Sequence, residues 1–152
     1  MTPGRWTRVI RAPRSEVYRA LLDPKAVQQW MVPDGMTSEV HSFEARQGGP
    51  FRISLTYDAP TDSGKTTAQT DTFHGHFIKL VPDTEIIQRV EFDTGDPGMQ
   101  GAMTISYLLA DSDDGTALTA VHEGLPPGLS AADNDLGWNM SLDKLTRIVE
   151  HP

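Results

Sequence analysis

The chain has 152 residues, 38% hydrophobic and 22% charged, a composition typical of one soluble globular domain. Its net charge of −8 disfavours phosphate backbones and anionic lipid surfaces as partners, so we expect neither nucleic-acid nor membrane binding. It has no cysteine, which excludes disulfides and thiolate chemistry and agrees with a reducing cytoplasm, the location that we expect.

Targeting and linker segments are not evident. Residues 1–11 hold no apolar leader with a small-residue cleavage site, and no run of about 20 apolar residues occurs. We therefore expect neither a secretion signal nor a membrane span. Glycines and prolines are spread along the chain as turn residues, and we expect residues 1–152 to form a single domain.

The first part of the chain predicts one strand followed by two short helices. Residues 6–12 form the strand, and Pro13 is typical of the first turn of a helix. Asp23 suits the N-cap of the second helix, with Pro24 at its first position. The apolar faces of the two helices are formed by Val17, Tyr18, Leu21 and Leu22, and by Ala26, Val27, Trp30 and Met31.

Apolar and polar residues alternate with a period of two from about residue 36 to residue 124. Such alternation is typical of antiparallel strands that have one covered face. Residues 51–57 and 103–109 show it most clearly, and turn signals rich in Gly, Pro and Asp separate the segments. The pattern predicts six strands in this region, and seven with the first.

A long amphipathic helix is predicted near the C-terminus. Ser130, followed three residues later by Asp133, is a capping-box pattern. The apolar stripe of the helix is formed by Trp138, Leu142, Leu145 and Val149. The concave face of a curved sheet is the only large apolar surface that could cover this stripe. The sequence therefore predicts an α+β fold: a seven-stranded curved antiparallel sheet wraps around the long C-terminal helix, and two short helices plug its open end.

Several short segments occur in the order and spacing of a known protein family. They are WMVPDG (30–35), EARQGGPFR (44–52), GHF (75–77), GTAL (115–118), HEGL (122–125) and GW (137–138), followed by Leu142 and Leu145. With this pattern the chain resembles the family of activators of the 90-kDa heat-shock protein ATPase (AHSA type), in the SRPBCC or START-like superfamily. The resemblance implies the helix-grip fold, which is also called Bet v 1-like. It extends to the C-terminal domain of the two-domain eukaryotic activator and not to its N-terminal domain.

A sheet wrapped around one helix leaves a cavity at its open end, and such cavities bind ligands. Strand phase places Gln88 and His122 on the inner face, together with Tyr57 and Tyr107. We expect the ligand to be a small hydrophobic or amphipathic molecule, held by these polar groups and by apolar walls. The predicted ligand-binding residues are Trp30, Phe51, Ile53, Tyr57, Gln88, Val90, Phe92, Met103, Tyr107, His122, Trp138 and Leu142.

Two other functions stay open at this point. One is a polyketide cyclase-, dehydratase- or hydrolase-like enzyme with His122 as its acid or base, which a carboxylate within hydrogen-bond reach of His122 would favour. The other is a protein-interaction domain or chaperone cofactor, which a large exposed apolar patch would favour.

The pair His74 and His76 shares one strand face, as in some metal sites. Phe73 and Phe77 occupy the opposite face as core residues, so the histidines are predicted to point outward, and no third ligand is evident. We therefore expect no metal and no other cofactor. The expected oligomeric state is a monomer or a homodimer.

Overall fold

In the described part of the chain, seven antiparallel strands form one sheet in the order β1-β7-β6-β5-β4-β3-β2. The computed structural model describes residues 3–58 and 70–152. The strands are β1 (Gly4–Ile10), β2 (Met36–Phe43), β3 (Pro50–Tyr57), β4 (Thr70–Val81), β5 (Glu85–Phe92), β6 (Met103–Ser112) and β7 (Gly115–Glu123). The helices are α1 (Arg14–Leu22), α2 (Pro24–Trp30) and α3 (Ala131–Glu150), and a 3₁₀ turn spans Pro97–Met99.

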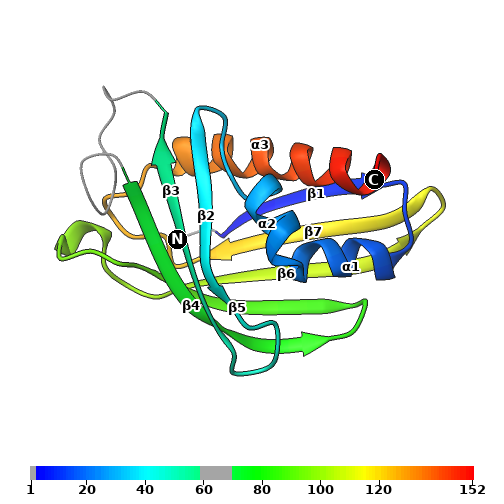
Figure 1. Cartoon of the computed structure of the whole chain (residues 1–152), viewed down its shortest axis with the longest axis horizontal. Coiled ribbons are helices and arrows are strands. Elements are labelled where there is room, and N and C mark those ends of the chain that lie inside the picture. Colours follow the sequence, from blue (N-terminus) through cyan, green and yellow to red (C-terminus); the bar gives the residue numbers. More distant parts are fainter. Residues whose placement is uncertain (1–2, 59–69) are drawn as a thin grey trace.

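The sheet curves, and the three α-helices pack together on one side of it (Figure 1). Consecutive strands from β2 to β7 are neighbours in the sheet, whereas β1 pairs with β7 at the far edge. The long helix α3 lies along this edge and contacts β1, α1 and α2. These features confirm the predicted α+β helix-grip architecture.

Two of the three helices begin at the capping residues that the sequence indicates. The Asp23 carboxylate accepts a hydrogen bond from the backbone N–H of Lys25 at 3.0 Å, at the start of α2. The Ser130 hydroxyl accepts one from the backbone N–H of Asp133 at 3.2 Å, at the start of α3. Each bond satisfies a backbone donor that the first helical turn leaves without a partner.

The inward-facing residues of the sheet and the second half of α3 form the core. Leu142, Leu145 and Val149 are buried, and burial of each leucine side chain contributes about 1.5–3 kcal/mol. Trp138, one turn earlier on the predicted stripe, is only half-buried. The two halves of α3 therefore differ: the residues from 142 onward fill the core, and the earlier ones lie beside the cavity described below.

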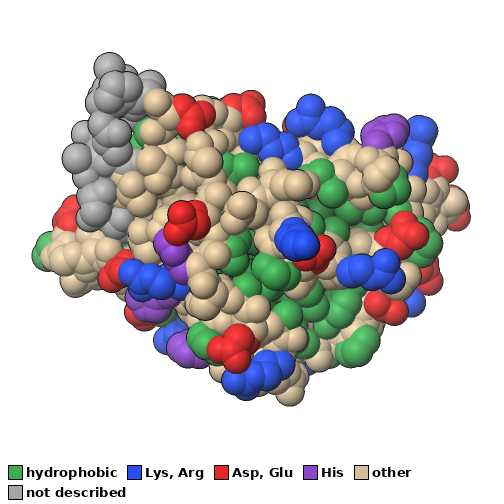
Figure 2. All heavy atoms as spheres, viewed as in Figure 1, with side chains coloured by type: hydrophobic (Ala, Val, Ile, Leu, Met, Phe, Trp, Pro, Cys, Tyr) green, Lys and Arg blue, Asp and Glu red, His purple; other side chains and the backbone are tan. Residues whose placement is uncertain are grey.

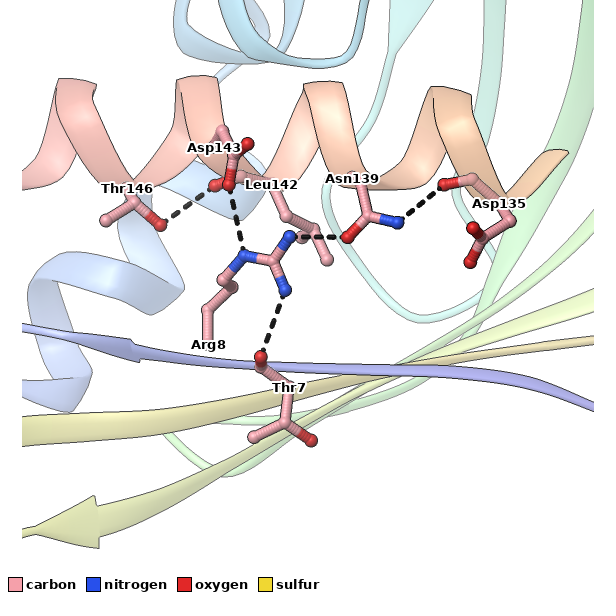
Figure 3. A network of polar contacts seen from close by, with 7 residues as sticks. All are labelled: Thr7, Arg8, Asp135, Asn139, Leu142, Asp143 and Thr146. Atoms are coloured by element: carbon pink, nitrogen blue, oxygen red, sulfur yellow. Dashed lines mark hydrogen bonds and ion pairs between the residues drawn. The ribbon is translucent and has the colours of Figure 1, made fainter. Parts of the chain in front are cut away.

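A polar network between the edge strand β1 and α3 ties the two elements together. The Arg8 guanidinium donates to Asp143 Oδ1 at 3.2 Å and to Asn139 Oδ1 at 2.6 Å (Figure 3). It also donates to the backbone oxygen of Thr7 at 3.1 Å. Because Asn139 in turn donates to the backbone oxygen of Asp135, the network joins successive turns of α3 to β1.

Candidate functional site

A cavity of about 190 Å³ lies between the concave face of the sheet and the first half of α3. The sheet contributes residues of β3 to β7, and the end of α2 with the segment after it contributes Trp30, Met31 and Pro33. Its lining is mostly apolar and rich in aromatic rings. The lining residues are Trp30, Met31, Pro33, Leu55, Asp71, Phe73, Gln88, Val90, Phe92, Met103, Ile105, Tyr107, His122, Leu129, Asp133, Asn134, Gly137, Trp138 and Ser141.

Most of the residues that the sequence proposes for ligand binding line this cavity. Strand phase placed those of β5, β6 and β7 on the inner face, and the structure has them there. They are Trp30, Gln88, Val90, Phe92, Met103, Tyr107, His122 and Trp138.

Phe51, Ile53, Tyr57 and Leu142 do not line the cavity. The ring of Phe51 packs 5.3 Å from that of Phe77 and 6.3 Å from that of Phe43, in an aromatic cluster of the core. Ile53 and Leu142 are core residues with 1% of their surface exposed, and Tyr57 lies at the last position of β3.

Sequence reasoning missed several lining residues. Leu55, Phe73 and Ile105 share the inner face with residues that were proposed, so their strand phase could have identified them. The same phase brings in Asp71, opposite Leu55 and only 2% exposed. The others come from the segment that follows α2, the segment that precedes α3 or the first turns of α3, where a period of two carries no signal. They are Met31, Pro33, Leu129, Asp133, Asn134, Gly137 and Ser141.

His122 is 7% exposed and has contacts at both ring nitrogens. Its Nδ1 accepts a hydrogen bond from the indole Nε1–H of Trp138 at 2.9 Å, and the Asn134 amide nitrogen lies 3.2 Å from the same atom. Since an indole N–H only donates, the neutral ring carries its hydrogen on Nε2, which lies 3.1 Å from Met103 Sδ. Burial lowers the pKa of His122 to about 4, so the ring is neutral at pH 7.

No carboxylate is hydrogen-bonded to His122 within residues 3–58 and 70–152. The Nδ1 lone pair is already shared by two nitrogen donors, and the pKa lies well below neutrality. A general base at pH 7 needs a free lone pair and a pKa near the working pH. The arrangement therefore suits a group that positions Trp138 better than it suits an acid or base.

Tyr107 and Gln88 are the two buried polar side chains of β6 and β5 that line the cavity. The Tyr107 hydroxyl is buried without a hydrogen-bond partner among the described residues, and burial raises the pKa of this phenol above its ordinary value. Gln88 is 3% exposed, and its amide makes no side-chain hydrogen bond to any described residue. Because Gln88 pairs with Ile105 and Tyr107 with Ile86, the two side chains are diagonal neighbours on the inner face.

Three aromatic rings surround this part of the cavity. The Tyr107 ring lies 6.2 Å from that of Trp30, edge to face, and 6.0 Å from that of Trp138. On its outer side Trp138 stacks on Trp6 at 5.1 Å, and the Trp6 indole donates to Asp135 at 2.8 Å. Packing and hydrogen bonds therefore hold the Trp138 wall from both sides.

A second hollow of about 220 Å³ lies beyond His122 and Asn134, which line both spaces. It is formed at the start of β1 and the end of β7, and Arg5 and Asp135 contribute charged groups to it. His122 and Asn134 are thus part of the partition between the two hollows.

His74 and His76 lie outside this site. Strand β4 places them on the face opposite Phe73 and Phe77, and His74 Nε2 is 3.8 Å from Glu91. Within the described residues, no three histidine, aspartate or glutamate side chains are grouped so that they could hold a metal ion. None of the described helices is long and apolar enough to cross a membrane.

Comparison with known proteins identifies the family. Residues 11–150 match the family described as activator of Hsp90 ATPase homolog 1-like protein. A crystal structure of a Chromobacterium violaceum protein is 34% identical, with a TM-score of 0.88 over 99% of this chain and 98% of that one. An AHSA1-like protein of Aeromonas hydrophila is 18% identical, with a TM-score of 0.73 over 98% of this chain and 92% of that one.

A further solved structure with this fold is DynU16, a protein of the dynemicin biosynthetic locus. It is 22% identical, with a TM-score of 0.67, over 98% of this chain and 47% of that one. The comparison with curated proteins returned no match. Because the family match spans nearly the whole chain and agrees with the fold, the chain belongs to the activator of Hsp90 ATPase homolog 1-like family.

Proposed function

We propose that this chain binds a small hydrophobic or amphipathic molecule in the cavity between the sheet and the first half of α3. The observation that carries the proposal is the cavity itself, with aromatic and aliphatic walls and a few buried polar groups. Small-molecule sites have this composition: the apolar walls supply affinity, and a few polar groups orient the ligand. The pocket residues proposed for binding are the eight from the sequence that line it, together with Leu55, Phe73 and Ile105.

An enzymatic role is the second candidate. DynU16, which shares the fold, comes from a biosynthetic locus. The superfamily that the sequence resembles also includes cyclases. The contacts of His122 support this candidate less well, because the ring is buried, neutral and already hydrogen-bonded at Nδ1. An acid–base reaction would need a catalytic acid or base other than His122. Ligand binding alone requires no such group.

The surface gives less support to a protein-interaction role. The large hydrophobic side chains exposed in the described part are Val9, Ile78, Leu108 and Leu136, which belong to four different elements. On the face that carries α1 and α2, Figure 2 shows hydrophobic side chains with acidic and basic side chains interspersed among them. Neither observation marks one extended apolar docking patch.

A matched pair of substitutions on β6 tests the proposed function. Ile105 lines the cavity, whereas Leu108, on the same strand, faces outward with 37% of its surface exposed. Ile105→Trp should fill the cavity and abolish binding of the neutral fluorescent probe N-phenyl-1-naphthylamine, and Leu108→Trp should leave it unchanged. Circular dichroism checks that both variants fold. Equal probe binding by both variants, or no binding by the unmodified protein, contradicts the proposal.

A further inference from the structure

Two polar side chains on the cavity wall, Tyr107 and Gln88, make no side-chain hydrogen bond within the described part of the chain. The Tyr107 hydroxyl is buried and makes no hydrogen bond to residues 3–58 or 70–152, and the Gln88 amide makes none to a described side chain. A buried polar group without a partner is costly, and native proteins satisfy nearly all such groups with protein, water or ligand. The Tyr107 hydroxyl is such a group, and the Gln88 amide is its diagonal neighbour on the same cavity wall, which indicates a place where a ligand atom completes the hydrogen bonds.

The hydrogen-bonding capacity of the two groups specifies the complementary atom. The phenol lacks an acceptor for its O–H, and the amide offers both donors and an acceptor. The elevated pKa of Tyr107 keeps the phenol protonated, so it remains a donor at neutral pH. One ligand oxygen, in a hydroxyl or a carbonyl group, can accept from both side chains. A hydroxyl can also donate to the amide oxygen of Gln88.

The charges around the cavity indicate the net charge of the ligand. Of the described residues that line the cavity, none is a lysine or an arginine, and two are the carboxylates Asp71 and Asp133. His122 also lines the cavity and could carry a positive charge, but it is neutral because burial lowers its pKa to about 4. An anionic ligand would lose its hydration without gaining a cation, which is unfavourable in an apolar site.

We infer that the ligand is a largely aromatic molecule that carries no negative charge and has a hydroxyl or carbonyl oxygen that the Tyr107 hydroxyl and the Gln88 amide bind together. This inference rests on the proposed function and names the ligand class of the same cavity. The rings of Trp30, Tyr107 and Trp138, with Phe73 and Phe92, favour flat conjugated molecules because aromatic pairs stack or meet edge to face.

Three bicyclic compounds that differ in a single substituent test the inference. Naphthalene has no polar group, 2-naphthol has a hydroxyl group, and 2-naphthoate is an anion at pH 7. Their affinities are measured by NMR titration, following the indole N–H signals of Trp30 and Trp138 on the cavity wall. 2-Naphthol should bind about fivefold to tenfold more tightly than naphthalene, as expected for one net hydrogen bond, and 2-naphthoate should bind most weakly.

The variants Tyr107→Phe and Gln88→Leu, and the two combined, show which groups cause the preference. The ratio of the 2-naphthol and naphthalene affinities should fall in each single variant and approach one in the combined variant, while naphthalene still binds. Tyr57→Phe removes a phenol hydroxyl outside the cavity and should leave the ratio unchanged.

The outcomes separate this inference from the proposed function. If the combined variant keeps the preference for 2-naphthol, or if 2-naphthoate binds most tightly, the inference is wrong while the cavity remains a binding site. The same holds if naphthalene binds the unmodified protein as tightly as 2-naphthol. If none of the three compounds binds and N-phenyl-1-naphthylamine also fails, both the proposed function and the inference are wrong.

Discussion

The indole Nε1–H of Trp138 donates a hydrogen bond to Nδ1 of His122 at 2.9 Å, and this bond links a wall of the cavity to strand β7. Asn134 adds a second contact to the same nitrogen at 3.2 Å. The bond sets the tautomer of His122 and leaves its Nε2–H beside the sulfur of Met103. The histidine that the sequence suggests as an acid or base therefore has a clear positioning role on Trp138.

The first prediction concerns the strength of this bond. His122→Leu removes the acceptor and leaves the Trp138 N–H without its partner, so we expect the free energy of unfolding to fall by about 1–3 kcal/mol. Urea denaturation measures the change. Trp138→Phe removes the donor, and the combined variant should lose less stability than the sum of the two single losses. Strict additivity would show that the bond contributes nothing.

The second prediction concerns pH. The pKa of His122 is lowered from its ordinary 6.5 to about 4, so the unfolded chain takes up a proton there at a higher pH than the folded chain does. The contribution to stability is complete above about pH 6.5 and is lost as the pH falls toward 4. At about 1.4 kcal/mol per pH unit, the loss is on the order of 3 kcal/mol.

His122→Leu serves as the control for this pH effect, because other groups titrate equally in both proteins. The stability advantage of the unmodified protein over His122→Leu at pH 7 should shrink steadily between pH 6.5 and pH 4. A constant difference between the two proteins over this range would show that His122 does not titrate with a lowered pKa.

The third prediction separates binding from folding at Tyr107. Its hydroxyl has no partner in the described part of the chain, so Tyr107→Phe removes an unsatisfied polar group and keeps the ring that packs against Trp30 and Trp138. We expect the stability to stay the same or rise by about 1 kcal/mol, while 2-naphthol binds more weakly. Thermal melting of the variant beside the naphthol titration provides both quantities. A marked loss of stability would mean that the hydroxyl has a structural partner in solution.

The period of two in the strands predicted much of the site, because it fixes which face each side chain occupies. Gln88, Val90 and Phe92 follow Ile86 on one face of β5, and all three line the cavity. The period of two does not show whether a residue lies at the level of the cavity or further along the strand. Phe51 and Leu55 share the inner face of β3, yet Phe51 joins the aromatic cluster with Phe77 and only Leu55 reaches the cavity.

The fold itself was predictable because its signals agree with one another: helix caps, strand alternation and one apolar stripe. The hydrogen-bond partners of His122 were not predictable from the sequence. Asn134 and Trp138 lie 12 and 16 residues further along the chain, and nothing in their spacing indicates a bond to a β7 side chain. Such bonds depend on where α3 crosses the sheet, which is set by the packing of Leu142 and Leu145 in the core. The residues of the loops, such as Pro33 and Leu129, depend on the same packing.

The last prediction concerns how α3 is fixed to the edge strand. Arg8 of β1 bonds to Asp143 and Asn139 of α3, and its side chain is 26% exposed while that of Asp143 is 62% exposed (Figure 3). Solvent screens the ion pair, which contributes well under 1 kcal/mol, and the bond to the Asn139 amide oxygen adds a similar amount. We therefore expect Arg8→Ala to lower the free energy of unfolding by about 1 kcal/mol.

Arg5 on the same strand provides the matched control, since its guanidinium makes no hydrogen bond or ion pair with any described residue. Arg5→Ala should leave stability within about 0.5 kcal/mol of the unmodified protein, as is usual for surface substitutions. Hydrogen exchange gives a local measurement: in Arg8→Ala the amides of the first half of α3 should exchange faster, because that half borders the cavity and has little core packing. Equal exchange and equal stability in the two variants would show that the network in Figure 3 does not hold the helix to the sheet.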